Sequence, residues 1–382
     1  MIEENKWYWE CNGQSFTNKL KALQEGKRSN QPVRFIENPA YRSHDCSSPS
    51  DKTWTELIKQ HALELREKYD HIRLWFSGGC DSLFILDSFV ANNIRLDEIV
   101  IFHTGYAKSD FETIQAEEYI KKIRHLIPST KINVNSHDES YYKNLYANQR
   151  WVEYGDLGGT FTFRSPHDVP NDNSFADLVG SKCEIIGKDK PHILKKNNKW
   201  YFYFIDHDVS KDMPLKDFLG TDIVNFYIDI PEIHIKQSHM LKDYIIANKV
   251  DLHKFYNNTL YRQDIQNKAC GRLIYNINYI KKILIYETVE IGEYEFPIGS
   301  LKDLAFADVI KYSDVVRKSF ANFKQDCFEM EKMFDAHYDF GKNCFIGNLS
   351  RFYCLDDQTV LTVDELFPDR FGLTKDKVDT TV

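Results

Sequence analysis

The stretch Leu74-Trp75-Phe76-Ser77-Gly78-Gly79-Cys80-Asp81-Ser82-Leu83 decides the fold, because an apolar run meets two glycines and a helical pattern begins directly after them. Glycines let the backbone turn tightly and approach an anion, and the free amides at a helix start favour negative charge. Ser77 and Ser82 add hydroxyl donors, and Asp81 can hold a divalent cation against phosphate groups. The stretch therefore predicts a strand, a phosphate-binding loop and a helix in direct succession.

The segments that follow this stretch alternate between strand and helix patterns up to residue 134. The expected segments are strands at residues 72–76, 98–102 and 131–134, and helices at residues 83–92 and 111–126. Further along, residues 184–187 have the apolar pattern of another buried strand, and Asn197-Asn198 is typical of a hairpin turn. This alternation predicts an α/β fold with a mostly parallel sheet that is covered by helices on both faces.

The chain divides by its patterns into three parts. Residues 1–70 form an N-terminal extension, which opens with the strand-like Trp7-Tyr8-Trp9 and ends in a helical pattern over Thr53–Tyr69. Residues 71–245 hold the phosphate-binding domain, and residues 246–382 are expected to be mainly helical. A length of 382 residues agrees with two or three structural units.

Composition and charge disfavour several classes of protein. Hydrophobic residues make up 42% and charged residues 28% of the chain, which argues against a disordered or fibrous protein. The formal net charge of −8 disfavours nucleic acid as the partner, because binding phosphates favours a basic surface. The eight cysteines form no CxxC pair and no zinc-ligand spacing, which indicates reduced thiols. The acidic start lacks a signal peptide and no run approaches the roughly 20 apolar residues of a membrane span, so we expect a cytoplasmic protein.

The loop sequence resembles the SGGxDS signature of the PP-loop, or N-type, ATP pyrophosphatases. All six positions match, with Cys80 at the unconstrained one, whereas Walker A and GxGxxG patterns do not fit. The resemblance implies an adenine nucleotide alpha hydrolase-like fold, ATP and Mg²⁺ as ligands, and cleavage of ATP to AMP and pyrophosphate. The residues to which it assigns nucleotide binding are Ser77, Gly78, Gly79, Cys80, Asp81 and Ser82. The alternatives are a glycine turn with Asp81 and Ser82 as helix caps, and a catalytic thiol at Cys80.

Two further segments become candidates through this resemblance. His103, Thr104 and Gly105 end the second expected strand, and the corresponding region of PP-loop proteins lies beside the adenosine. The alternative for His103 is a bond to a neighbouring loop. Gly187-x-Asp189 is similar to the segment that holds magnesium pyrophosphate in asparagine synthetase-like domains, which implies Mg²⁺ binding by Asp81 and Asp189.

Three lysines are candidates for neutralising the negative charge of the leaving group. Pyrophosphate departs with several negative charges, so nearby cations stabilise it. Lys188 and Lys190 flank Asp189, and Lys236 matches by chain order a phosphate-contacting lysine of the asparagine synthetase relatives. The alternatives are an exposed charged turn for the first two and a solvated helix face for Lys236.

The expected reaction is activation of a carboxylate or carbonyl oxygen with ATP, followed by attack of a nitrogen nucleophile. The acceptor is a small or macromolecular substrate whose identity the sequence does not indicate. The chain begins Met1-Ile2 without a nucleophilic cysteine, so we expect an asparagine synthetase-like enzyme without a glutaminase domain. The aromatic start and the GxDKP segment resemble asparagine synthetase-like proteins of phage genomes, which would place the protein in a host cytoplasm. The alternatives are modification of a nucleobase in RNA or DNA, and nucleotide binding without turnover.

Overall fold

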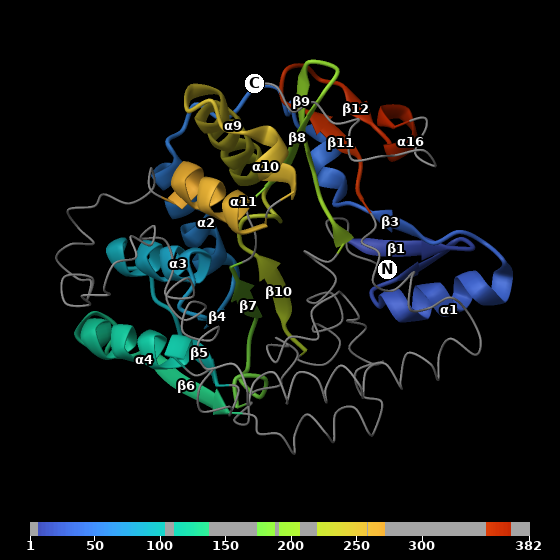
Figure 1. The fold of residues 1–382 in the computed structure, drawn as a ribbon. Coiled ribbons are helices and arrows are strands. Elements are labelled where there is room, and N and C mark those ends of the chain that lie inside the picture. Colours follow the sequence, from blue (N-terminus) through green and yellow to red (C-terminus); the bar gives the residue numbers. More distant parts are fainter. Residues whose placement is uncertain are drawn as a thin grey trace, which may run out of the picture.

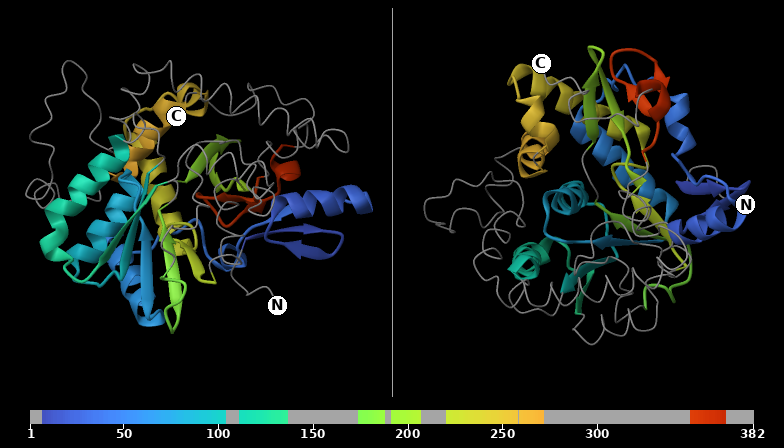
Figure 2. Two further views of the ribbon diagram at one scale, coloured as in Figure 1. Left: turned by 90° about the horizontal axis from the view of Figure 1, so that it is seen from below. Right: turned by 45° about the vertical axis from the view of Figure 1, so that its right-hand side comes forward.

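A computed structural model describes residues 7–103, 111–136, 174–187, 191–206, 220–257, 259–271 and 349–367 of the chain. These residues form an α/β structure with one parallel and two antiparallel sheets (Figure 1). The N-terminal elements and the helix over Phe111–Ile123 lie at opposite ends of the molecule in both Figure 1 and the left view of Figure 2. No helix in the described ranges combines the length and the apolar character that a bilayer span requires.

The parallel sheet has five strands in the order β10-β7-β4-β5-β6. Their bounds are β4 (His71–Trp75), β5 (Glu98–His103), β6 (Lys131–Ser136), β7 (Lys182–Ile186) and β10 (Asp222–Asn225). The chain runs outward from β4 through β5 to β6 and then returns to pair β7 with the other side of β4. The strand order therefore reverses between β4 and β7. The four strands expected from the sequence are confirmed, and β10 is added to them.

Helices α3 (Cys80–Ala91) and α4 (Phe111–Ile123) connect β4 to β5 and β5 to β6, with a short turn η2 (Arg124–Leu126) after α4. Both crossovers run in the same direction along the sheet, so right-handed connections place both helices on one face, as Figures 1 and 2 show. Helix α2 (Trp54–Lys68) packs beside α3. The apolar core on this face includes Ile72, Leu74, Ile99, Ile101, Cys183, Ile185, Leu83, Ile85 and Phe89. Helices on the second face stay a prediction.

The second face of the sheet carries a buried charge network. Arg73 of β4 lies opposite Glu98 of β5 and Glu184 of β7, and its guanidinium is 3.1 and 3.3 Å from their carboxylates. All three side chains are buried. Asn133 donates to Glu98 and Thr221 donates to Glu184, at 3.0 and 3.1 Å. Burial raises the pKa of Glu184, although the Arg73 cation acts in the opposite direction. The centre of the sheet is thus held by charge as well as by apolar packing.

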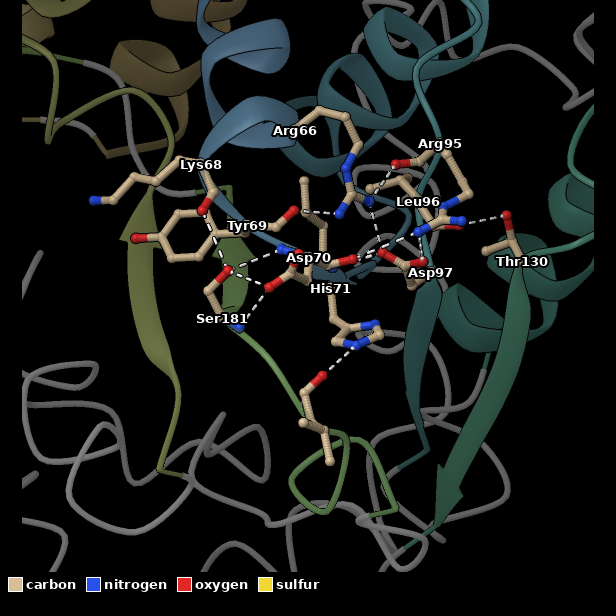
Figure 3. A network of polar contacts seen from close by, with 12 residues as sticks. Arg66, Lys68, Tyr69, Asp70, His71, Arg95, Leu96, Asp97, Thr130 and Ser181 are labelled. Atoms are coloured by element: carbon tan, nitrogen blue, oxygen red, sulfur yellow. Dashed lines mark hydrogen bonds and ion pairs between the residues drawn. The ribbon is translucent and has the colours of Figure 1, made fainter.

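Polar contacts fasten the strands at their amino-terminal ends (Figure 3). Arg66 at the end of α2 forms an ion pair of 2.7 Å with Asp97, which also accepts a 2.8 Å hydrogen bond from the amide of Ile72. Asp70 accepts hydrogen bonds of 2.9 Å from the amide and the hydroxyl of Ser181, just before β7. These contacts join the starts of β4, β5 and β7, so the loop after β4 leaves the sheet at the opposite, carboxyl edge.

The N-terminal extension forms its own antiparallel sheet of β1 (Tyr8–Cys11), β2 (Gln14–Phe16) and β3 (Arg34–Ile36), in the order β2-β1-β3, with α1 (Lys19–Ser29) and η1 (Pro39–Ser43). This confirms the strand predicted at the aromatic start. Tyr41 donates a 2.6 Å hydrogen bond to the carbonyl of Ile228, and the indole of Trp7 donates to Asp229 at 3.2 Å. The extension is therefore fixed to the turn that follows β10.

The second antiparallel sheet has the order β12-β11-β9-β8. Its hairpin, β8 (His192–Lys196) and β9 (Lys199–Tyr203), turns at Asn197 and Asn198 with φ of 51° and 60°, which confirms the predicted hairpin. The helical segments after β10 are α9 (Pro231–Ala247), α10 (Leu252–Asn257), α11 (Thr259–Gln266), η3 (Asn267–Gly271) and α16 (Val363–Leu366). Residues 246–382 also contain β11 (Phe352–Cys354) and β12 (Val360–Leu361), two strands that the helical prediction for this region does not include.

Candidate functional site

The loop between β4 and α3 has the geometry of an anion site. Gly78 has a φ of 69°, in the left-handed region that glycine adopts without strain. Gly79 is the N-cap of α3 and has no side chain to cap the helix, and its own amide donates to the hydroxyl of Ser77 at 3.4 Å. The first amides of a helix have no partner within the helix, so an uncapped start presents donors and the positive end of the helix dipole. The predicted succession of strand, loop and helix is confirmed, with the helix starting at Cys80 rather than Leu83.

The two serines of the loop differ in exposure. Ser82 is 2% exposed, and its hydroxyl lies 3.2 Å from the hydroxyl of Ser77 and accepts from the Ser77 amide at 3.2 Å. The same hydroxyl donates to the carbonyl of Gly79 at 3.2 Å. Ser77 is exposed. Ser82 thus closes the loop from within, whereas Ser77 is accessible to a ligand.

Asp81 lies in the first turn of α3 and is half-buried. Its backbone carbonyl accepts a 2.9 Å hydrogen bond from the hydroxyl of Tyr227. Within the described ranges, no group of three or more His, Cys, Asp or Glu side chains could hold a metal ion. Asp189, the second predicted Mg²⁺ ligand, lies outside these ranges together with Lys188 and Lys190. The magnesium site stays a prediction that rests on Asp81.

The end of β7 lies directly against the start of α3. A Cβ atom at Gly187 would be 2.9 Å from the backbone nitrogen of Ser82 and 3.1 Å from the carbonyl carbon of Asp81. The sequence singles out this glycine as the end of a strand and as part of Gly187-x-Asp189, and the structure adds that close packing against α3 requires it. The segment predicted to hold pyrophosphate begins at Gly187, which lies beside the loop at Ser77–Ser82.

The other predicted nucleotide residues lie at the end of β5 and directly after it in the sequence. His103 is the last residue of that strand, opposite Ser136 of β6, and Thr104 and Gly105 lie outside the described ranges. Because β5 pairs directly with β4, the carboxyl end of β5 is one strand away from the loop. Nucleotide binding by His103, Thr104 and Gly105 stays a prediction.

Lys236 lies in α9, which begins at Pro231. Its ammonium donates a 2.9 Å hydrogen bond to the carbonyl of Ser50, in the segment before α2. No hydrogen bond or ion pair among the described residues joins Lys236 to the loop at Ser77–Ser82. The structure brings together the loop and Gly187, but it adds no contact in favour of a phosphate role for Lys236.

The sequence does not predict an aromatic cluster that packs against α3. The indole of Trp54 is stacked with Tyr227 at 6.2 Å and 10° and with Phe84 of α3 at 6.2 Å and 22°. The sequence identifies Trp54 only as part of the apolar stripe of a helix, and Tyr227 is not singled out at all. Since Tyr227 is 146 positions away from Asp81, no local pattern indicates their contact.

The loop lies at the point of the sheet where ligands bind in open parallel sheets. In open parallel sheets, ligands bind outside the carboxyl ends of the strands where the strand order reverses, which here is between β4 and β7. The loop follows β4, and Gly187 follows β7. No family model, no curated protein and no solved structure matches the chain, so the functional argument rests on the motif and this arrangement.

Proposed function

We propose that this chain is an ATP-dependent adenylating enzyme of the PP-loop type, which cleaves ATP to AMP and pyrophosphate. The observation that supports the proposal best is the loop at Ser77–Ser82. It combines the SGGxDS pattern with a left-handed Gly78 and an uncapped helix start, at the point where the strand order reverses. The proposal includes an adenine nucleotide alpha hydrolase-like arrangement of the parallel sheet.

The donor set of the loop fits a polyphosphate. Amides at the start of α3 and the exposed hydroxyl of Ser77 offer hydrogen bonds to an anion. The Ser82 hydroxyl holds the loop in shape from the buried side, so little reorganisation is needed when an anion binds. In our proposal these groups hold the pyrophosphate part of ATP.

Charge compensation at the leaving group is assigned to side chains near the loop. Asp81, together with Asp189, would hold Mg²⁺, which neutralises the phosphate oxygens. Lys188 and Lys190 would add positive charge from the segment after Gly187, and Lys236 from α9. Asp81 is in the first helical turn, where a carboxylate also interacts favourably with the helix dipole.

The proposed reaction has two steps. A carboxylate or carbonyl oxygen of the acceptor attacks the α-phosphorus, a P–O bond forms, and the bond to the β-phosphate oxygen breaks with its electron pair going to pyrophosphate. A nitrogen nucleophile then attacks the adenylated carbon and displaces AMP. This is the chemistry of asparagine synthetase-like ligases, and the acceptor is a small molecule or a macromolecule.

Incubation with α-labelled ATP and Mg²⁺ tests the proposal, with and without a metabolite extract. We expect extract-stimulated AMP from the wild type and a loss of about 100-fold or more in Asp81→Asn, which keeps the shape but removes the charge. Glu232→Gln is a matched control, because Glu232 is an exposed acidic residue in the first turn of α9. ADP as the product would contradict the proposal, and ATP binding without any product would favour a binding protein instead.

A further inference from the structure

Tyr227 touches the start of α3 although it belongs to a distant part of the chain. It follows β10 by two residues and is 2% exposed. Its hydroxyl donates a 2.9 Å hydrogen bond to the backbone carbonyl of Asp81. A tyrosine hydroxyl that reaches the first turn of a helix can set the position of that turn.

The ring of Tyr227 is held in place by stacking. Trp54 lies against Tyr227 and against Phe84, so the three rings connect the start of α2, the first turns of α3 and the segment after β10. Trp54 is the first residue of α2, and Thr53 fixes this helix start through a capping box with Glu56. The ring therefore has a rigid support, and the hydroxyl keeps its direction toward Asp81.

The backbone on both sides of Tyr227 is fixed as well. The amide of Phe226 donates to the carbonyl of Ile186 at 3.1 Å, which ties the turn to the end of β7. The carbonyl of Ile228 accepts a 2.6 Å hydrogen bond from Tyr41 of the N-terminal extension. Tyr227 is thus positioned by the sheet on one side and by the extension on the other.

The accepting carbonyl belongs to a peptide group that matters for anion binding. In a trans peptide the C=O and N–H point in opposite directions, so the carbonyl of Asp81 and the amide of Ser82 form one rigid unit. In a helix this amide points toward the N-terminal end, and at the third helical position it has no partner within the helix. A donor on the carbonyl also polarises the amide on the other side of the peptide. Gly187 packs against the nitrogen of the same unit.

We infer that Tyr227 is a positioning residue of the loop at Ser77–Ser82, which holds the Asp81–Ser82 peptide so that the Asp81 side chain and the first turn of α3 are in place for the phosphates. The inference rests on the proposed function for its consequence in catalysis, because the phosphates are those of ATP. It also gives the N-terminal extension a role, since Tyr41 holds the turn that carries Tyr227.

Two tyrosine-to-phenylalanine variants separate positioning from stability. Tyr227→Phe removes the hydrogen bond to Asp81 and keeps the ring in the stack. Tyr69→Phe is the matched control, because it also removes the hydroxyl of a buried tyrosine, which here donates a 2.9 Å hydrogen bond to Asp222 at the start of β10, at the edge of the sheet opposite the loop. Both variants are compared with the wild type in MgATP binding, in KM and kcat for AMP formation, and in amide hydrogen exchange of residues 77–84.

For Tyr227→Phe we expect faster exchange of the loop amides and a KM for MgATP about fivefold higher, the factor that corresponds to one ordinary hydrogen bond. Tyr69→Phe should lower thermal stability without changing either quantity. Equal KM and equal loop exchange in Tyr227→Phe and Tyr69→Phe would overturn the inference while leaving ATP cleavage in place. If the wild type does not bind ATP, the proposed function fails, and the exchange data still decide whether Tyr227 orders the loop.

Discussion

Gly187 lies so close to α3 that a Cβ atom at this position would be 2.9 Å from the backbone nitrogen of Ser82. Real Cβ contacts of this length do not occur, and the contacted atom is backbone rather than the end of a flexible side chain. The strand β7 and the helix α3 can therefore keep their present spacing only with glycine at position 187. The same contact makes the loop sensitive to any change at the end of β7.

Gly187→Ala is expected to destabilise the protein by about 1–3 kcal/mol, because the added methyl group overpacks the site. It should also weaken MgATP binding, since the start of α3 must move. Gly220→Ala is the control: Gly220 has a φ of 62° and nothing within 4 Å of the added Cβ atom, so the cost there is backbone strain of about 1–2 kcal/mol. Chemical denaturation and ligand titration on both variants check this, and equal ATP affinity in both would contradict it.

Arg73→Met is expected to lower the free energy of unfolding by about 3–5 kcal/mol, because Glu98 and Glu184 lose their buried cation. The loss should grow between pH 5 and pH 8. Burial already raises the pKa of Glu184, and without Arg73 the folded state would favour the protonated carboxyl still more. A carboxyl group whose pKa is raised in the folded state stabilises that state while it is protonated, and this contribution is lost as the pH rises.

Lys121→Met serves as the comparison for the Arg73 variant. The Lys121–Glu118 pair is solvent-exposed, with side-chain exposures of 65% and 49%, so little change is expected. Urea denaturation of both variants at the two pH values gives the result. A similar small loss in both would show that the buried network does not stabilise the sheet.

Asp87→Asn is expected to gain stability relative to the wild type as the pH rises. Asp87 of α3 accepts a hydrogen bond from Tyr119 of α4, and burial raises the pKa of Asp87 from 3.8 to about 7. Between these values the unfolded chain is charged while the folded protein keeps the proton, so wild-type stability falls with increasing pH. The difference in unfolding free energy between variant and wild type should shift toward the variant from pH 5 to pH 8. Asp177→Asn, at an exposed aspartate, is the control for the removal of one carboxylate. A constant difference for Asp87→Asn over this pH range would contradict the prediction.

The effect of a substitution in the turn of the β8–β9 hairpin on stability should depend on whether the new residue tolerates a positive φ. Asn197 and Asn198 have φ of 51° and 60°, a conformation that glycine adopts freely and that a β-branched residue resists. Asn198→Gly should leave stability nearly unchanged, whereas Asn198→Val should destabilise by about 1–2 kcal/mol. Thermal unfolding of the two variants is the measurement, and equal melting temperatures would argue against a left-handed turn.

The sequence predicts the part of the fold in which local pattern and long-range contact agree. The strands at β4, β5 and β6 have apolar runs of strand length. The loop is predicted from its local sequence alone, because two glycines precede Asp81. Helix α2 is also predicted, because its apolar residues repeat at helical spacing, and the structure adds that Thr53 caps it. These features depend on neighbours within about ten residues.

What the sequence does not predict depends on contacts between distant residues. The strand β11 pairs with β9 about 150 positions earlier, with Tyr353 opposite Phe202, and its three residues are too few to predict a strand on their own. Arg73 stands within an apolar run, and its role becomes clear only when β7 brings Glu184 beside it, 111 positions away. Tyr227 could not be predicted either, because its proposed role depends on one hydrogen bond to the backbone carbonyl of Asp81, which no pattern of side chains indicates.

The attachment of the N-terminal extension to the turn after β10 imposes an order on biosynthesis. Trp7 and its acceptor Asp229 are separated by 222 positions, so at about 5–20 residues per second the tryptophan leaves the ribosome roughly 10–45 s before its partner is made. During this interval the aromatic residues Trp7 and Tyr41 lack their final contacts after β10. We expect the nascent chain to be a client of holding chaperones until β10 is complete, and slower translation of residues 50–230 to increase aggregation rather than the yield of folded protein.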